Sequence, residues 1–98
     1  MPAEPRPSAL VLRAQDHPFD HRDSRFLFRK PLVATPAALE AFGLETIRRC
    51  YLELQQLAQQ QRGLDYGQAF DDRGNPDGPP LWFIEDQEVV TALLPSDY

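Results

Sequence analysis

Residues 81–98, LWFIEDQEVVTALLPSDY, decide the fold that this sequence predicts. Two apolar runs, 81–85 and 88–94, lie on either side of a tight acidic turn at 86–87, which indicates two paired strands. We therefore expect a β-hairpin over residues 81–94. Its first strand is apolar at four successive positions, so it would present apolar side chains on both faces of a sheet. A second cover is then needed, from an N-terminal strand or from another subunit.

A long amphipathic helix is predicted over about residues 44–61. Its apolar side chains recur at the i, i+3, i+4 and i+7 spacings of one buried stripe. They are Leu44, Ile47, Tyr51, Leu54 and Ala58. The opposite side carries arginines and glutamines, so only one side of the helix would meet a core. A shorter helix is expected just before it, because Thr35 can cap free backbone N–H groups, Pro36 suits a first helical position and Gly43 can end the helix.

Three further segments have strand-like patterns: residues 8–13, 25–29 and 65–70. The second carries two aromatic residues on one face and could continue into 32–34. The expected fold class is α+β, with an antiparallel sheet of three or four strands, including the hairpin 81–94, packed on the one long amphipathic helix. The proline-rich residues 1–7 are expected to be disordered or extended, and residues 8–98 to form a single α+β domain.

The net charge of −5 is unevenly distributed along the chain. Residues 1–34 carry six basic and four acidic side chains, whereas residues 35–98 carry four basic and eleven acidic ones. Because an acidic surface is repelled by nucleic-acid phosphates and by anionic membranes, this balance argues against direct contact with either. No apolar run is long enough to cross a membrane, and the proline-rich start does not resemble a signal peptide, so a cytoplasmic location is expected.

No catalytic residue, metal site or cofactor is predicted. The only cluster of metal-competent side chains comprises His17, His21, Asp16, Asp20 and Asp23. A helix would put two imidazoles at this spacing on one face, as zinc sites use, but Pro18 disfavours helical backbone at His17, so a solvated loop is the favoured interpretation. Cys50, the single cysteine, falls beside the apolar stripe of the long helix and is expected to be a buried thiol.

The hairpin and its acidic turn are the predicted interaction surface. The candidate contact residues are Trp82, Glu85, Asp86, Glu88 and Tyr98. A solvent-facing Trp82 would be a natural anchor for a protein partner, although its pattern fits a core position equally well. The acidic residues fit either a solvated strand edge, which resists aggregation, or a surface that docks a basic partner.

Residues 32–40, LVATPAALE, and residues 81–98 form two blocks that resemble a family of small bacterial proteins often encoded on plasmids and other mobile elements. The first block is similar to that family's apolar strand followed by Thr-Pro and a short helix. The second is similar to its Leu-Trp-aliphatic-Ile strand, acidic turn and closing Thr-x-Leu-Leu-Pro-x-acid-Tyr, and residues 65–67 match an Asp-aromatic-Gly element. The resemblance implies one compact α+β unit of bacterial origin. It supplies no catalytic residues, because the family has no assigned activity.

These observations predict a non-enzymatic small bacterial domain that acts through protein–protein contacts, with a protein partner or with a second copy of itself. The alternative is an acidic inhibitor that occupies the basic groove of a nucleic-acid-binding protein, which requires carboxylates gathered on one face. A third option is a small enzyme of unknown class. That option requires a concave pocket holding two or more of His17, His21 and the aspartates.

Overall fold

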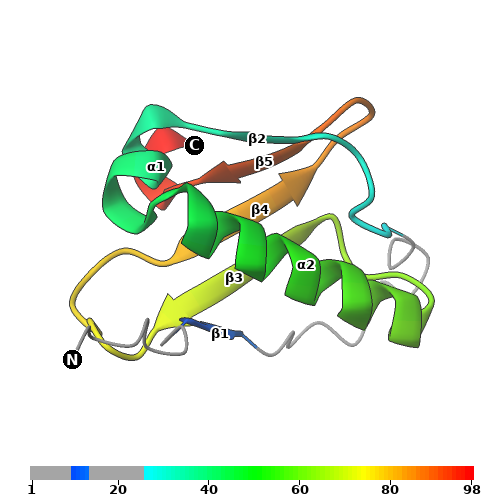
Figure 1. The fold of residues 1–98 in the computed structure, drawn as a ribbon, viewed down its shortest axis with the longest axis horizontal. Helices are drawn as coiled ribbons and strands as arrows, with labels where there is room; N and C mark the ends of the chain where they lie inside the picture. The colour runs from blue at the N-terminus through cyan, green and yellow to red at the C-terminus, as the bar shows by residue number, and fades with distance from the viewer. Residues whose placement is uncertain (1–9, 14–25) are drawn as a thin grey trace.

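The computed structural model describes residues 10–13 and 26–98, which form one mixed sheet with two α-helices (Figure 1). The strands are β1 (Leu10–Leu12), β2 (Leu32–Ala34), β3 (Gly67–Asp72), β4 (Leu81–Glu85) and β5 (Val90–Leu93). The helices are α1 (Pro36–Phe42) and α2 (Leu44–Gln61), and a short 3₁₀ helix, η2 (Pro95–Asp97), follows the last strand. The order across the sheet is β1-β3-β4-β5-β2.

The sheet differs from the prediction of three or four antiparallel strands, because it has five strands and is mixed. β1, β3, β4 and β5 pair antiparallel in succession, whereas β2 lies parallel to β5 at the edge. A parallel neighbour needs a long connection, and here α1, α2, β3 and β4 all intervene between β2 and β5. The sequence pattern around β2 is too short to reveal this pairing.

The strand predicted over residues 25–29 is wrong. In the described part of that range, the only ladder contact is a bridge between Phe26 and Leu64. Phe28 has a φ of +54°, a left-handed conformation that interrupts any extended run. The strand in this region begins only after Pro31, as β2.

Both predicted helices are confirmed. Thr35 caps α1 by accepting a 3.1 Å hydrogen bond from the backbone N–H of Ala38, and Pro36 occupies the first turn. Gly43, at a φ of +82°, redirects the chain between α1 and α2 without the steric penalty that a side chain would bring. α2 ends at Arg62, which adopts the left-handed conformation and donates its backbone N–H to Ala58.

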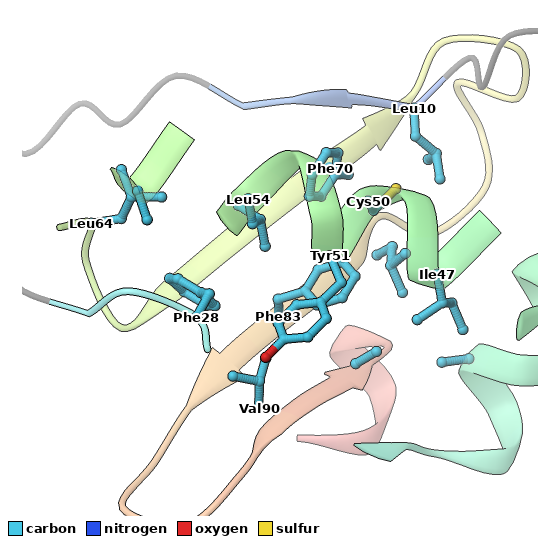
Figure 2. Packing of buried hydrophobic residues seen from close by; sticks show 14 of the residues in the cluster. Leu10, Phe28, Ile47, Cys50, Tyr51, Leu54, Leu64, Phe70, Phe83 and Val90 are labelled. Carbon is cyan, nitrogen blue, oxygen red and sulfur yellow. The ribbon is translucent and has the colours of Figure 1, made fainter. Parts of the chain in front are cut away.

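The core lies between α2 and one face of the sheet (Figures 1 and 2). Alternate strand residues point toward the helix, including the fully buried Phe70, Phe83 and Val90. The ring of Phe83 stacks on that of Tyr51 at 6.3 Å and meets the edge of Phe70 at 5.6 Å. The predicted N-terminal strand does not cover the other face, because β1 joins the sheet at its edge. In residues 10–13 and 26–98, no helix is long and apolar enough to span a bilayer.

Candidate protein-interaction surface

The side of the sheet that faces away from α2 is also largely apolar. Strand side chains alternate between faces, so the residues between the core positions all point to this second side. Ala69, Trp82 and Leu93 are aligned across three adjacent strands, and Gly67, Ile84, Thr91 and Val33 form the neighbouring row. We call this surface the open face; it comprises the outward sides of Val11, Val33, Gly67, Ala69, Asp71, Trp82, Ile84, Thr91 and Leu93.

Neither α1 nor α2 lies on the open face, as the ribbon shows (Figure 1). Val33 is 44% exposed and Val11 37% exposed, while Trp82 and Ile84 are half-buried. Leu93 is buried, yet it does not belong to the core cluster beneath α2. Leu93 lies opposite Trp82 in the ladder.

The end of the chain adds an aromatic ring to the open face. Tyr98, 79% exposed, lies edge-on to Trp82 with the ring centroids 5.9 Å apart. Asp97 fixes this end of the chain, because its Oδ2 accepts hydrogen bonds from the Thr35 hydroxyl at 2.7 Å and from the Leu94 backbone N–H at 3.0 Å. The N–H of Leu94 and the hydroxyl of Thr35 hold the pKa of Asp97 below its ordinary value. The same Thr35 that begins α1 thus positions Tyr98 beside Trp82.

On the open face, the negative charge of Asp71 in β3 is balanced by Arg13, which follows β1. Among the described residues, the charged side chains of Arg13 and Asp71 point to this side, and they form a bidentate ion pair. Arg13 Nε lies 3.0 Å from Asp71 Oδ2, and Arg13 Nη2 lies 2.5 Å from Asp71 Oδ1. The hydrogen bond from Arg13 lowers the pKa of Asp71, so the pair stays ionised and neutral as a whole at physiological pH.

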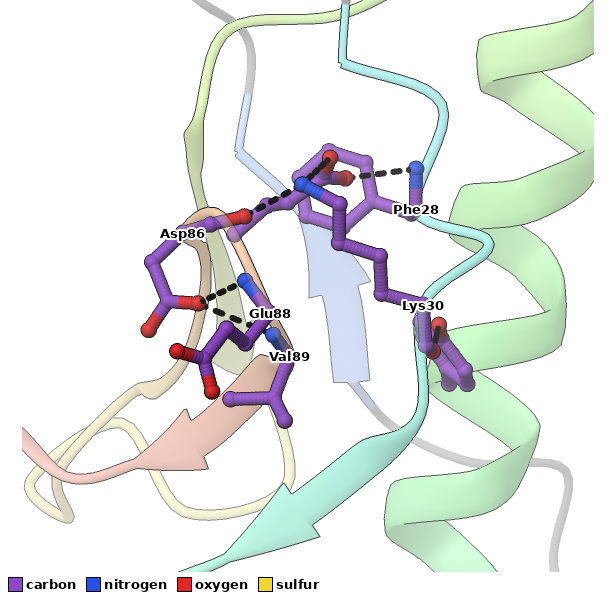
Figure 3. A network of polar contacts seen from close by, with 7 residues as sticks. Phe28, Lys30, Asp86, Glu88 and Val89 are labelled. Atoms are coloured by element: carbon purple, nitrogen blue, oxygen red, sulfur yellow. Dashed lines mark hydrogen bonds and ion pairs between the residues drawn. The ribbon is translucent and has the colours of Figure 1, made fainter.

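Glu85, a predicted contact residue, points to the core side and is only 8% exposed. Its Oε1 accepts a 2.8 Å hydrogen bond from the Phe28 backbone N–H, and its Oε2 lies 3.2 Å from Lys30 Nζ (Figure 3). The side-chain ammonium of Lys30 also donates a hydrogen bond to the Asp86 carbonyl, and the backbone carbonyl of Lys30 accepts one from the Tyr51 hydroxyl. Burial raises the pKa of Tyr51, so this hydroxyl remains a donor. The carboxylate of Glu85 therefore stabilises the positive φ of Phe28 rather than facing a partner.

Asp86 and Glu88 lie at the exposed tip of the hairpin. Asp86 Oδ1 accepts hydrogen bonds from the backbone N–H groups of Glu88 at 2.7 Å and Val89 at 2.9 Å, which closes the turn (Figure 3). The backbone N–H of Val89, and to a smaller extent that of Glu88, lowers the pKa of Asp86. The predicted contact residues thus occupy three places: Trp82 and Tyr98 on the open face, Asp86 and Glu88 at the tip, and Glu85 inside.

Other candidate sites offer less chemistry. His17 and His21 lie outside the described residues, and among residues 10–13 and 26–98 no three metal-competent side chains come together. A hollow of about 470 Å³ on the outer side of α2 contains none of the aspartates; it is lined by Leu44, Glu45, Arg48, Arg49 and Leu52. Cys50 is buried, as predicted, and burial raises the pKa of its thiol to about 12.

Sequence reasoning missed most of the open face. Period-two alternation in β4 placed Trp82 and Ile84 on one side, but it did not reveal that Val33 and Ala69 join them, because that requires the strand order. No family model matches this chain, and no curated protein or solved structure does either.

Proposed function

We propose that this chain is a non-enzymatic protein-binding domain and that the open face is its contact surface. The observation that carries the proposal is that, within residues 10–13 and 26–98, the helices cover only one side of a sheet that is apolar on both sides. An antiparallel sheet with one face in water normally alternates apolar and polar residues, whereas β4 presents Trp82 and Ile84 outward. Contiguous apolar surface of this kind is typical of sites where proteins bind one another.

Trp82 and Tyr98 are the expected anchors of the contact. Large aromatic side chains contribute most of the binding energy in many interfaces, particularly near the centre of the patch. Trp82 stands between Ala69 and Leu93 in the middle strand of the sheet, and Tyr98 extends its ring surface. The Arg13–Asp71 pair lies toward the β1 edge, where a polar rim is expected.

The alternative of an acidic inhibitor has less support. It needs free carboxylates on one face, and five of the described carboxylates are engaged within the chain, Asp72 and Asp86 by backbone N–H groups of their own turns. Asp71 pairs with Arg13, Glu85 with Lys30, and Asp97 with Thr35 and Leu94. The open face, in contrast, has apolar side chains that no described helix covers.

The test is photocrosslinking from two matched positions. The photoreactive residue p-benzoylphenylalanine replaces Val33 on the open face in one variant, and Leu52, 58% exposed on the outer side of α2, in the other. We expect the protein to crosslink from position 33 to a defined peptide of one protein, which mass spectrometry identifies. Adding Tyr98→Ser to this variant should lower the yield of the crosslinked product. Equal crosslinking from both positions, or none from position 33, would overturn the proposal.

A further inference from the structure

We infer that the partner of the open face is the open face of a second copy of this chain, in a two-fold dimer with the two sheets packed face to face. This inference rests on the proposed function and adds the identity of the partner. Two-fold contacts bring the same patch of both copies together, so the patch must be complementary to itself in charge and in shape.

Repulsion between two copies of this acidic chain is weaker at the open face than at its charged surfaces. The chain carries a net charge of −5, so two copies repel each other over most approaches. Among the described residues, the charge of Asp71 on the open face is balanced by Arg13, with which it forms an ion pair. The hairpin tip, with the exposed Asp86 and Glu88, would instead face a second copy with like charge. A neutral apolar face has no unpaired charge with which a strongly charged partner could pair, and it can contact the same face of a second copy without repulsion.

Shape supports the same partner. Trp82 and Ile84 make a ridge along β4, while Gly67 and Ala69 leave a furrow along β3 beside it. A Cβ added at Gly67 would meet no atom within 4 Å, so the space above this residue is open. When two sheets pack with strands about 30° apart, side chains of one inner face interdigitate with those of the other. The ridge of each copy can therefore enter the furrow of the other.

The edges of the sheet favour this arrangement over edge-to-edge pairing. Both edge strands, β1 and β2, have only three residues, and β2 lies between Pro31 and Pro36. Short edges and flanking prolines are features that prevent the addition of another strand. Self-association is thus directed to the face of the sheet.

The size of the sheet sets the expected strength of the dimer. At ~3.3 Å per residue and ~4.8 Å between strands, the five strands cover a flat area on the order of 300 Å². Each partner in a standard interface buries roughly 800 Å² of accessible surface. This patch is smaller than a standard interface, so we expect a weak, reversible dimer that is strengthened by salt, because added ions screen the repulsion between the acidic chains.

Sedimentation equilibrium of the purified full chain tests the inference. The average mass should rise from 11.2 kDa toward twice that value as the protein concentration increases to about 1 mM. A Cβ at Gly67 meets no atom within 4 Å, so we expect Gly67→Val to fill the furrow, to weaken dimerisation at least tenfold and to leave the thermal stability of the folded state unchanged. Val33→Lys should weaken it similarly. Leu52→Lys, an equally exposed apolar-to-lysine change on the outer side of α2, should leave the dimer unchanged.

Each outcome separates this inference from the proposed function. A wild-type chain that stays monomeric at every concentration overturns the dimer, and so does a dimer that is indifferent to both Gly67→Val and Val33→Lys. If the chain is monomeric but position 33 crosslinks to a different protein, the open face is a binding surface with another partner. If position 33 gives no crosslink at all, the proposed function fails together with the dimer.

Discussion

Phe83 and Trp82 are neighbours in β4 and point to opposite faces of the same sheet. Phe83 is fully buried beneath α2, with aromatic contacts to Tyr51 and Phe70. Trp82 is half-buried, and its ring contact is with the exposed Tyr98. Two large aromatic residues one position apart therefore have very different surroundings, although the composition of their faces is similar.

The difference arises because the described chain supplies one long helix for two apolar faces. α2 has a single apolar stripe and can cover only one side of the sheet. Sheets of a few strands need apolar cover to be stable in water, and the covered face meets that need. The open face is then available for binding. This comparison predicts that substitutions on the covered face change stability, whereas substitutions on the open face mainly change association.

The largest effect is expected from Phe83→Ala. Removing a fully buried aromatic side chain leaves a cavity and typically costs about 3–5 kcal/mol of stability, a large part of the total for a small domain. Trp82→Ala should cost only about 1–2 kcal/mol, because Trp82 is partly exposed and its neighbours can relax. Urea unfolding followed by circular dichroism measures both values. Equal losses for the two variants would mean that the open face is a second core rather than a binding surface.

A smaller effect is expected at Glu85, a buried polar residue of the covered face. Glu85→Leu removes the acceptor of the Phe28 backbone N–H and leaves that buried donor unsatisfied, at a cost of about 2–3 kcal/mol. Glu85→Gln keeps a carbonyl oxygen for this hydrogen bond and loses only the charge facing Lys30, so about 1 kcal/mol is expected. The same urea titration compares them. If Gln is as damaging as Leu, the ion pair with Lys30, and not the bond to Phe28, is the stabilising contact.

The melting temperature at acidic pH should depend on the ionisation of Asp97, which holds Tyr98 at the border of the open face. Its pKa is lowered from 3.8 by the Leu94 N–H and the Thr35 hydroxyl, so its contribution to stability is present above pH 3.8 and is lost as pH falls through the folded-state value. Asp97→Asn should therefore melt at a lower temperature than the wild type at pH 7. The gap should close as the pH falls through the lowered folded-state pKa of Asp97. A gap that is constant with pH would assign the effect to shape and not to charge.

The sequence predicted those parts of the fold that depend on contiguous residues. The stripe of α2, the Thr35-Pro36 start of α1 and the hairpin of β4 and β5 are all encoded within short segments, and all are confirmed. The parallel pairing of β2 with β5 and the left-handed Phe28 depend on distant partners. Phe28 is held by Glu85, 57 residues away, and no local pattern predicts a positive φ at a phenylalanine.

The candidate surface was predictable to a similar extent. Trp82 and Tyr98 were both in the predicted interface, and the structure brings their rings together. Glu85 was placed on the wrong side, because nothing in a strand that is apolar on both faces says which side meets the helix. Once Phe83 faces α2, the two-residue period of the strand requires Glu85 to face it as well.

The smallest change is expected from Tyr98→Ser, and it tests the open face most directly. Tyr98 is 79% exposed, so its loss should alter stability by no more than about 0.5 kcal/mol. Trp82 is the single tryptophan of the chain, so emission excited selectively from tryptophan reports on the open face. In dilute wild-type protein, acrylamide should quench this emission in the folded state, and Tyr98→Ser should make quenching stronger by uncovering the edge of the indole. Raising the protein concentration should reduce quenching if the face is covered by a second copy. Emission that is shielded from acrylamide even in dilute protein would show that the indole is already covered in the monomer, and the contrast between Phe83 and Trp82 would then lose its meaning.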